Sequence, residues 1–387
     1  VLDMEQLKEW IAAHPALELR EEEGQGRYVV AARDVAAGEV LLVQYPYAWC
    51  TFEAFAGKTC RCCMGPIVGA LLDEEAEDLP PVLVERLRRR QVRCKVCLAV
   101  FYCSTACQKQ DAKEHFQDEC RVLKQLSQAQ ASYPDSTLSE LKLLLRVISR
   151  MKAERIYGLP PADAEAEQQA VERGEEEREG GEGEYLQSWV RNRKFEDYLL
   201  LVSRPEDFPE EELASLRYWI VDYVRGLQEY FQRCMQGPAM AKAVDAKRRR
   251  AQEVSLEVLD ADLLLDVLCR NRRNGFCFGN GVHEEPQGQG VYLAPALFNH
   301  SCAPNVRLVT MGPNQAPSPD LPMLQESTKR SNACGPLLVF EASTAVAKGQ
   351  PLTLSYLDNG LLLDDTAQRL APRRDCALRR KELMSSF

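Results

Sequence analysis

The sequence lacks any apolar run that approaches the roughly 18 residues of a membrane-spanning helix. It also lacks a secretory signal, because the stretch from Leu2 to Gln6 is polar and acidic. The first residue is Val1 rather than methionine, which we interpret as the sign of a trimmed chain. These absences predict a protein that stays out of the membrane and works in the cytoplasm, the nucleus or both.

Positive charge is also in deficit, with a formal net charge of −10 over 387 residues. A protein with this balance repels nucleic acid, and two short basic runs, 86–93 and 247–250, are interpreted as solvated helix faces. Direct binding to nucleic acid is therefore not expected. The chain is long enough for two or three domains with their own cores, and we expect a monomer.

Cysteine, in contrast, is abundant, with 15 residues in a chain that lacks a secretory signal. In a reducing compartment, metal binding is a more common use of such residues than disulfide formation. Two Cys-x-x-Cys pairs, a Cys-x-x-x-Cys and a His-x4-Cys supply enough ligands for two closed tetrahedral zinc sites. The eight candidate ligands are Cys60, Cys63, Cys94, Cys97, Cys103, Cys107, His115 and Cys120.

The spacing alone does not decide whether these half-sites pair consecutively or interleave. Cys62 is a further uncertainty, because it could compete with Cys63 for the first site. In either pairing the protein would fill all four positions of each site, so no position would be open for a substrate. We therefore expect the zinc ions to be structural.

The first part of the chain predicts β-structure. Residues 17–32 form a β-rich stretch around Gly24 and Gly26, which indicates a hairpin, and residues 40–43 predict a further strand. The two glycines fit a plain turn, and they also fit a turn whose backbone approaches a cofactor closely.

A long helical region separates this part from the end of the chain. Apolar residues within 138–151 recur at helical spacing and predict a buried helix, and we expect helices over most of the stretch that follows. From Leu263 onward, glycine and asparagine residues interrupt the pattern, which we interpret as β-structure again. Residues 337–340 and 351–356 predict two of these strands.

A second motif, residues 299–305 (Asn-His-Ser-Cys-Ala-Pro-Asn), lies more than two hundred residues after the first cysteine pair. A Cys–His hydrolase is one interpretation, but adjacent residues of a strand point to opposite faces and no orienting acid is evident. Asn299 and His300 instead offer hydrogen bonds to a small polar molecule. A strand that ends at Tyr356 follows later in the chain.

The cysteine-rich stretch, in particular Tyr-Cys-Ser-Thr-Ala-Cys-Gln at residues 102–108, closely resembles a MYND zinc finger. Two features depart from the family pattern: the long span between the first two pairs, and His-x4-Cys in place of the commoner His-x3-Cys. The resemblance implies a docking surface for proline-containing peptides. It also implies interleaved pairing, with one zinc on Cys60, Cys63, Cys103 and Cys107 and the other on Cys94, Cys97, His115 and Cys120.

The motif at 299–305, followed by residues 349–356, resembles a SET-domain methyltransferase, and residues 24–39 resemble the N-terminal half of that domain. A SET domain interrupted by a MYND finger is the arrangement of the SET and MYND domain (SMYD) family of protein lysine methyltransferases. The resemblance implies an α+β fold, with a SET-type β-rich catalytic domain split by the finger and by a helical SET insertion. The implied segments are an N-terminal SET half (1–56), the MYND finger (57–122), the helical SET insertion (123–262), the core SET (263–370) and the truncated start of a post-SET region (371–387).

The same resemblance implies transfer of a methyl group from S-adenosylmethionine to a protein lysine, with histones as one candidate substrate and chromatin as one setting. Tyr356 would stand at the methyl-transfer channel, and Tyr292 and Phe298 would line it or pack in the core. The implied cofactor-binding residues are Gly24, Gln25, Gly26, Asn274, Asn299 and His300.

In this family, post-SET cysteines share a third zinc with the cysteine of the Asn-His-Ser-Cys motif, here Cys302. Such cysteines do not follow residues 379–387 in the sequence, so we expect two zinc ions rather than three, and weak activity of this chain. The alternative function is a non-catalytic MYND interaction scaffold with an incomplete SET domain.

Overall fold

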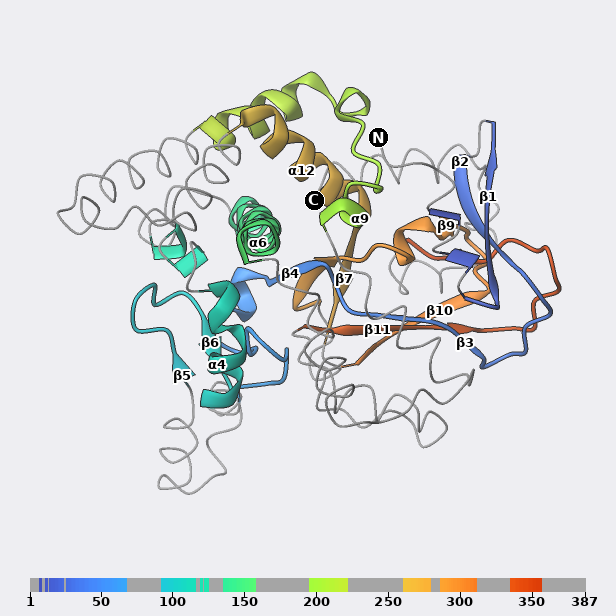
Figure 1. The fold of residues 1–387 in the computed structure, drawn as a ribbon, viewed down its shortest axis with the longest axis horizontal. Coiled ribbons are helices and arrows are strands. Elements are labelled where there is room, and N and C mark those ends of the chain that lie inside the picture. Colours follow the sequence, from blue (N-terminus) through green and yellow to red (C-terminus); the bar gives the residue numbers. More distant parts are fainter. Residues whose placement is uncertain are drawn as a thin grey trace, which may run out of the picture.

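The computed structural model combines helices and strands, which confirms the expected α+β class (Figure 1). None of the described helices is both long enough and apolar enough to cross a bilayer. The residues that the structure describes are 7–8, 11–12, 14–23, 26–67, 92–115, 119–120, 122–124, 135–157, 195–221, 260–279, 286–311 and 335–356.

The predicted hairpin is present. β1 (Leu17–Glu22) and β2 (Gly26–Ala31) pair antiparallel, with Leu17 opposite Ala31. Gly26 has a φ of 75°, a left-handed conformation that glycine adopts without steric cost. An added β-carbon there would meet nothing within 4 Å, so conformation rather than crowding requires the glycine.

Two three-stranded antiparallel sheets join chain segments from both sides of the cysteine-rich region. In each sheet one strand precedes that region and two follow it, which brings the halves of the split domain together (Figure 1). The first sheet has the order β10 (Val306–Met311), β11 (Leu337–Ala342) and β3 (Val40–Gln44). The second has the order β4 (Ala48–Thr51), β8 (Gly288–Val291) and β7 (Gly275–Phe278).

The strand expected at 351–356 is shorter in the structure. β12 (Thr353–Leu354) pairs in parallel with β9 (Asn299–His300). The residues just before β12 hydrogen-bond to β2, since the Leu352 amide donates to the Val29 carbonyl at 2.9 Å. β2 also contacts the turn η6 (Pro295–Leu297), which leads into β9. The hairpin and the Asn-His motif therefore lie on neighbouring segments.

The helix predicted around 138–151 is α6 (Asp135–Tyr157), and the five residues of its predicted stripe are each at most 3% exposed. α6 packs against β4 and against α12. In Figure 1 α6 lies above the cysteine-rich part, whose helix α4 it also contacts. The stripe residues are Leu138, Leu141, Leu145, Ile148 and Met151.

The expectation of β-structure from Leu263 onward is wrong, because α12 spans Ala261–Asn274. The Asp260 side chain caps this helix by accepting a hydrogen bond from the Asp262 amide at 2.9 Å. Leu264 and Leu268, one turn apart, are buried on the same face. The β-structure begins only at Gly275, so α12 crosses the expected boundary between the helical insertion and the core SET.

The remaining described helices are short. α9 and η5 precede a helical stretch at 210–221, and η1 lies beside the first cysteine pair. The described residues of the cysteine-rich part include a two-stranded hairpin, the helix α4 and further helical residues at 119–120 and 122–124. Their bounds are η1 (Glu53–Phe55), β5 (Val92–Arg93), β6 (Phe101–Tyr102), α4 (Thr105–Glu114), α9 (Phe195–Tyr198) and η5 (Pro205–Asp207).

Candidate metal centres and cofactor site

The local structure of the cysteine-rich part brings distant thiols together. Ser104 caps α4 by accepting a hydrogen bond from the Cys107 amide at 3.2 Å, which fixes Cys107 on the first turn beside Cys103. The Cys94–Cys97 knuckle closes through Leu98, whose φ of 59° is left-handed and whose amide donates to the Cys94 carbonyl. The first turn of α4 thus positions the Cys107 sulfur, and the knuckle positions the sulfurs of Cys94 and Cys97.

The first cluster contains the ligand atoms of Cys60, Cys63, Cys103 and Cys107, which all lie within 4.8 Å of one another. The Cys63–Cys103 and Cys103–Cys107 sulfur pairs are each 3.6 Å apart. Thiolates at about 2.3 Å from a tetrahedral zinc ion are about 3.8 Å apart. The four thiols therefore fit a zinc ion in donor type and in spacing.

The second cluster gathers Cys94, Cys97, His115 and Cys120 within the same 4.8 Å limit, and all four side chains are buried. Cys94 Sγ lies 3.6 Å from Cys120 Sγ, and Cys97 Sγ lies 3.6 Å from His115 Nε2. Three thiols and an imidazole at these separations also fit tetrahedral zinc. The interleaved pairing matches the grouping that the sequence resemblance implies.

Cys62 lies outside both clusters, although it is buried between two of the ligands. Its sulfur contacts the Gln110 side-chain carbonyl at 3.6 Å, which directs it towards α4. In this arrangement Cys63 rather than Cys62 completes the first cluster.

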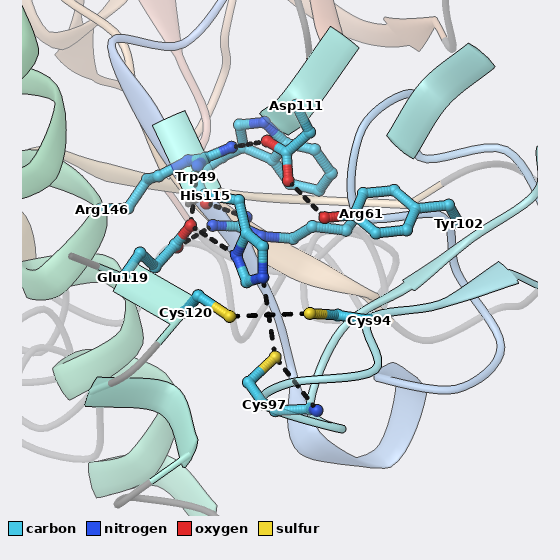
Figure 2. A network of polar contacts seen from close by, with 11 residues as sticks. Trp49, Arg61, Cys94, Cys97, Tyr102, Asp111, His115, Glu119, Cys120 and Arg146 are labelled. Atoms are coloured by element: carbon cyan, nitrogen blue, oxygen red, sulfur yellow. Dashed lines mark hydrogen bonds and ion pairs between the residues drawn. The ribbon is translucent and has the colours of Figure 1, made fainter. Parts of the chain in front are cut away.

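Glu119 orients the histidine of the second cluster from behind (Figure 2). His115 Nδ1 lies 3.3 Å from Glu119 Oε2, on the opposite side of the ring from Cys97. A metal-bound histidine commonly donates its other ring N–H to a carboxylate, which fixes the tautomer and the ring plane. Glu119 is 1% exposed, so this contact is shielded from water.

Two arginines compensate the buried carboxylate. Arg61 Nη2 lies 2.5 Å and Arg146 Nη1 lies 2.9 Å from the Glu119 oxygens. Burial alone would raise the pKa of Glu119, but the two guanidinium groups outweigh it and hold the pKa well below its usual range. Arg146 also pairs with Asp111, whose other oxygen accepts a hydrogen bond from Tyr102 at 2.8 Å.

Asp111, His115 and Glu119 lie within 4.8 Å of one another as well. Because Arg146 pairs with both carboxylates, their charge is already balanced. We therefore interpret this third group as the support of the second cluster rather than as a separate metal site.

A different polar group forms where β9 and β12 meet. Tyr356 turns back onto β9, since its amide donates to His300 Nδ1 at 3.0 Å and its hydroxyl donates to the Phe298 carbonyl at 2.5 Å. The rings of His300 and Tyr356 are 5.4 Å apart, and His300 Nε2 lies 3.4 Å from Cys302 Sγ. The structure thus brings the predicted His300 and Tyr356 together.

Asn299 offers an unused amide at this place. It is half-buried, and within the described part of the chain its side chain has no hydrogen-bond partner. The second asparagine of the motif, Asn305, is in contrast fully engaged: its Nδ2 donates to the Pro351 carbonyl and its Oδ1 accepts from the Thr353 amide, each at 2.9 Å. Asn305 fastens the motif to the segment around β12 that leads to Tyr356, while Asn299 keeps donors and an acceptor for a ligand.

Asn274, the third predicted asparagine, lies at the end of α12. Its Nδ2 donates to the Val202 carbonyl at 2.8 Å and to the Arg270 carbonyl at 2.7 Å. The Val202 carbonyl belongs to a row of four successive carbonyls at 200–203, named here the carbonyl segment, each of which accepts from a side chain. The donors are Arg27 to Leu200, Arg270 to Leu201, Asn274 to Val202 and Arg273 to Ser203.

Gly24 and Gln25 lie outside the described residues. Their neighbour Gly26 begins β2, and Arg27 joins β2 to the carbonyl segment at 3.0 Å. Tyr292 and Phe298 are fully buried core residues: Phe298 stacks on Phe340, and the Tyr292 hydroxyl donates to the Pro336 carbonyl. Core packing, one of their two expected roles, accounts for both.

Sequence reasoning missed the charged residues behind the second cluster. One signal was available, because Glu119 follows His115 by four residues and i, i+4 side chains meet on a helix. The partners Arg61 and Arg146 are far away in the sequence, and their meeting depends on how the cysteine-rich part packs on α6. Arg27 and Arg270 were missed for the same reason.

Comparison with known proteins points to one family. The family model described as "MYND finger" matches residues 85–120. A SET and MYND domain-containing protein of Dictyostelium discoideum is 27% identical over 349 residues, covering 89% of this chain and 55% of that protein. The histone-lysine N-methyltransferase SMYD3 of Mus musculus is 22% identical over 347 residues, covering 89% of this chain and 56% of that protein. The chain thus spans a little over half the length of these relatives.

Among solved structures, the SET domain of LSMT bound to lysine and AdoHcy aligns with 92% of this chain and 54% of its own. The sequence identity is 11% and the TM-score is 0.32, a level of likeness that supports no argument.

Proposed function

We propose that this chain, which is similar over most of its length to SET and MYND domain proteins, transfers a methyl group from S-adenosylmethionine to a lysine side chain of a protein. The observation that carries the proposal is the polar group of Asn299, His300 and Tyr356 where β9 and β12 meet. The half-buried Asn299 amide, without an internal partner among the described residues, supports a polar ligand at this place.

In this proposal Asn299 and His300 hold the amino-acid end and the adenine edge of the cofactor. The turn at 24–26 lines the rest, and Asn274 supports the site by fastening the carbonyl segment to α12. S-adenosylmethionine supplies an electrophilic methyl group when bound. Methyl transfer is an in-line displacement, so orientation of the attacking amine matters more than acid–base strength. The Tyr356 hydroxyl, fixed by the Phe298 carbonyl, is suited to accept a hydrogen bond from that amine and to aim it.

The attacking lysine must be neutral. A desolvated site lowers the pKa of a lysine amine, and a nearby positive charge lowers it further. The residues around Tyr356 include no described carboxylate in hydrogen-bond contact with its hydroxyl, so we assign no dedicated general base. In this proposal the lysine ammonium loses its proton to solvent water.

We further propose that each cysteine cluster holds one structural zinc ion and that the finger, residues 57–122, docks proline-containing protein partners. The exposed side chains of Val96 and Leu98 on the Cys94–Cys97 knuckle support an apolar contact surface. The same proposal includes histones as candidate substrates. It also places the action of the protein in the nucleus or the cytoplasm.

A methyl-transfer assay tests the function. The purified chain is incubated with methyl-labelled S-adenosylmethionine and an undermethylated protein extract that includes histones, and label on lysine is measured. We expect transfer by the wild type and a loss of about a hundredfold or more in Tyr356→Phe, a cost like that of removing one preorganised hydrogen-bonding group at a reacting centre. The control Tyr218→Phe changes a 67% exposed ring and should leave the rate unchanged.

A wild-type chain that binds the cofactor but labels no protein would point to a missing substrate. The wild-type chain could instead bind protein partners through the finger but neither bind the cofactor nor label protein. That result would favour the non-catalytic scaffold. Equal rates for the wild type and Tyr356→Phe would remove Tyr356 from the reaction.

A further inference from the structure

The buried carboxylate Glu119 connects the second zinc cluster with groups outside it. One oxygen faces His115 Nδ1 at 3.3 Å and also accepts from Arg146 at 2.9 Å, while the other accepts from Arg61 at 2.5 Å (Figure 2). All four side chains are at most 7% exposed. A buried ion network of this kind has few alternative arrangements, because each charge needs its partners.

Arg146 does not belong to the finger. It projects from α6, which also packs against β4 and α12 of the body of the protein. From there its guanidinium pairs with Glu119 and with Asp111 of α4, so one side chain ties two finger residues to the body. Arg61 adds a second tie, since its Nη1 donates to the Trp49 carbonyl in β4 at 2.7 Å.

The first cluster is supported differently. Cys63 Sγ accepts from the Gly65 amide at 3.4 Å, and Ser104 lies 4.0 Å from Cys103 Sγ, both within the finger's own turns. Its four ligands are thiols, so it has no imidazole ring whose orientation a distant carboxylate could set. The two zinc sites therefore differ in how far their affinity depends on the rest of the molecule.

We propose that Arg146 is a positioning residue for the second zinc site: it holds Glu119 against His115, so that zinc affinity at Cys94, Cys97, His115 and Cys120 depends on docking of the finger onto α6. By linkage, zinc at this site in turn stabilises that docking. This rests on the proposal that both clusters hold zinc. The functional consequence is that loss of one of the two zinc ions loosens the finger from the body of the protein.

The space around the network favours a selective effect. A small cavity of about 20 Å³, enough for about one water molecule, borders Arg61 and Glu119 at the junction of finger and body, with Lys142 also in its lining. Water can therefore reach Glu119 once Arg146 is removed, and a hydrated carboxylate no longer needs to hold the His115 ring. Loss of such an outer partner typically weakens metal binding 10- to 100-fold.

The experiment compares Arg146→Met with Arg150→Met in the full chain. Arg150 lies one turn further along α6, where its guanidinium lies over the Tyr47 ring and pairs with Glu154. Each protein is loaded with Co²⁺, whose absorption bands distinguish a four-thiolate site from a three-thiolate, one-imidazole site. Chelator competition then gives the affinity of each site separately.

We expect the three-thiolate, one-imidazole site of Arg146→Met to bind about 10- to 100-fold more weakly, with the four-thiolate site unchanged. Arg150→Met should leave both unchanged. Arg146→Lys should restore part of the affinity, because an ammonium keeps a point charge but loses the fork that spans both carboxylates. Equal weakening of the two sites, or no weakening, in a folded Arg146→Met protein overturns the proposal.

Glu119→Gln provides a second variant if Arg146→Met does not fold. It keeps the volume and an acceptor but removes the charge, and it should weaken the same site alone. An unchanged site in this folded variant also overturns the proposal. A wild-type chain that binds no metal at either cluster contradicts instead the proposal that the finger holds zinc.

Discussion

At the residue scale, the candidate sites divide into side chains with internal partners and side chains without. Asn305 and Asn274 use their amides to fasten backbone segments, whereas Asn299 leaves its amide unpaired among the described residues. The three asparagines look equivalent in the sequence. Spacing could predict the eight side chains that form the two clusters, because a chelate needs short fixed separations, but it could not tell a fastening asparagine from a binding one.

His14 gives the residue scale a pH-dependent prediction. It is 8% exposed and accepts a hydrogen bond from the Ala16 amide at 3.3 Å. Burial, followed by the nearby charge of Arg33, lowers the pKa of His14 to about 4. The unfolded chain, with an ordinary histidine pKa near 6.5, therefore binds the proton first, and stability falls as the pH drops from about 6.5 to about 4. The full loss is about 3 kcal/mol.

The measurement is chemical denaturation of the wild type and His14→Asn between pH 4 and 7.5. Asparagine can accept the same hydrogen bond but does not titrate, so the difference in unfolding free energy between the two proteins should change by about 3 kcal/mol over this range. Parallel curves would show that His14 does not contribute.

At the element scale, the strands near the hairpin and the long buried stripe of α6 followed from the sequence, because turn residues and apolar periodicity are local signals. The start of β-structure did not. Because of the glycine and asparagine residues near 274–281, the start of β-structure was predicted too early in the chain. The Asp260 cap and the Leu264–Leu268 spacing indicate a helix instead. The short pairing of β9 with β12 depends on contacts between distant segments, which no local pattern contains.

The carbonyl segment at 200–203 provides the prediction for this scale. Arg270 donates to the Leu201 carbonyl at 2.9 Å, pairs with Asp266 at 2.5 Å and lies over the Tyr198 ring. The segment joins Asn274 to the hairpin through Arg27, so it connects two parts of the proposed cofactor site. We expect Arg270→Gln to weaken S-adenosylmethionine binding roughly tenfold, about 1.4 kcal/mol.

Equilibrium binding of the labelled cofactor checks this expectation, with zinc content measured on the same samples. Arg217→Gln is the matched control, since Arg217 is 53% exposed and pairs only at the surface with Glu210. If the folded Arg270→Gln protein binds S-adenosylmethionine as tightly as the wild type does, the carbonyl segment does not contribute to the cofactor site.

At the scale of the whole molecule, the chain is a domain whose sheets are completed by segments from both sides of a metal-binding insert. β3 and β4 precede the finger, and their sheet partners come after it, more than two hundred residues beyond β3 and β4 in the sequence. The sequence could predict that two such halves meet, from the motifs at 24–39 and 299–305. It could not predict how the insert is fastened, because Arg61 and Arg146 acquire their roles only when the finger rests on α6.

The central claim, that the junction of β9 and β12 binds S-adenosylmethionine, is tested most directly by calorimetry with this cofactor on the wild type, Asn299→Ala and Arg217→Gln. We predict saturable binding by the wild type and by Arg217→Gln. Asn299→Ala, which removes hydrogen bonds to a charged ligand, should bind about 10- to 100-fold more weakly. Absence of binding by a folded, zinc-loaded wild-type chain, or an unchanged affinity in Asn299→Ala, would contradict the account.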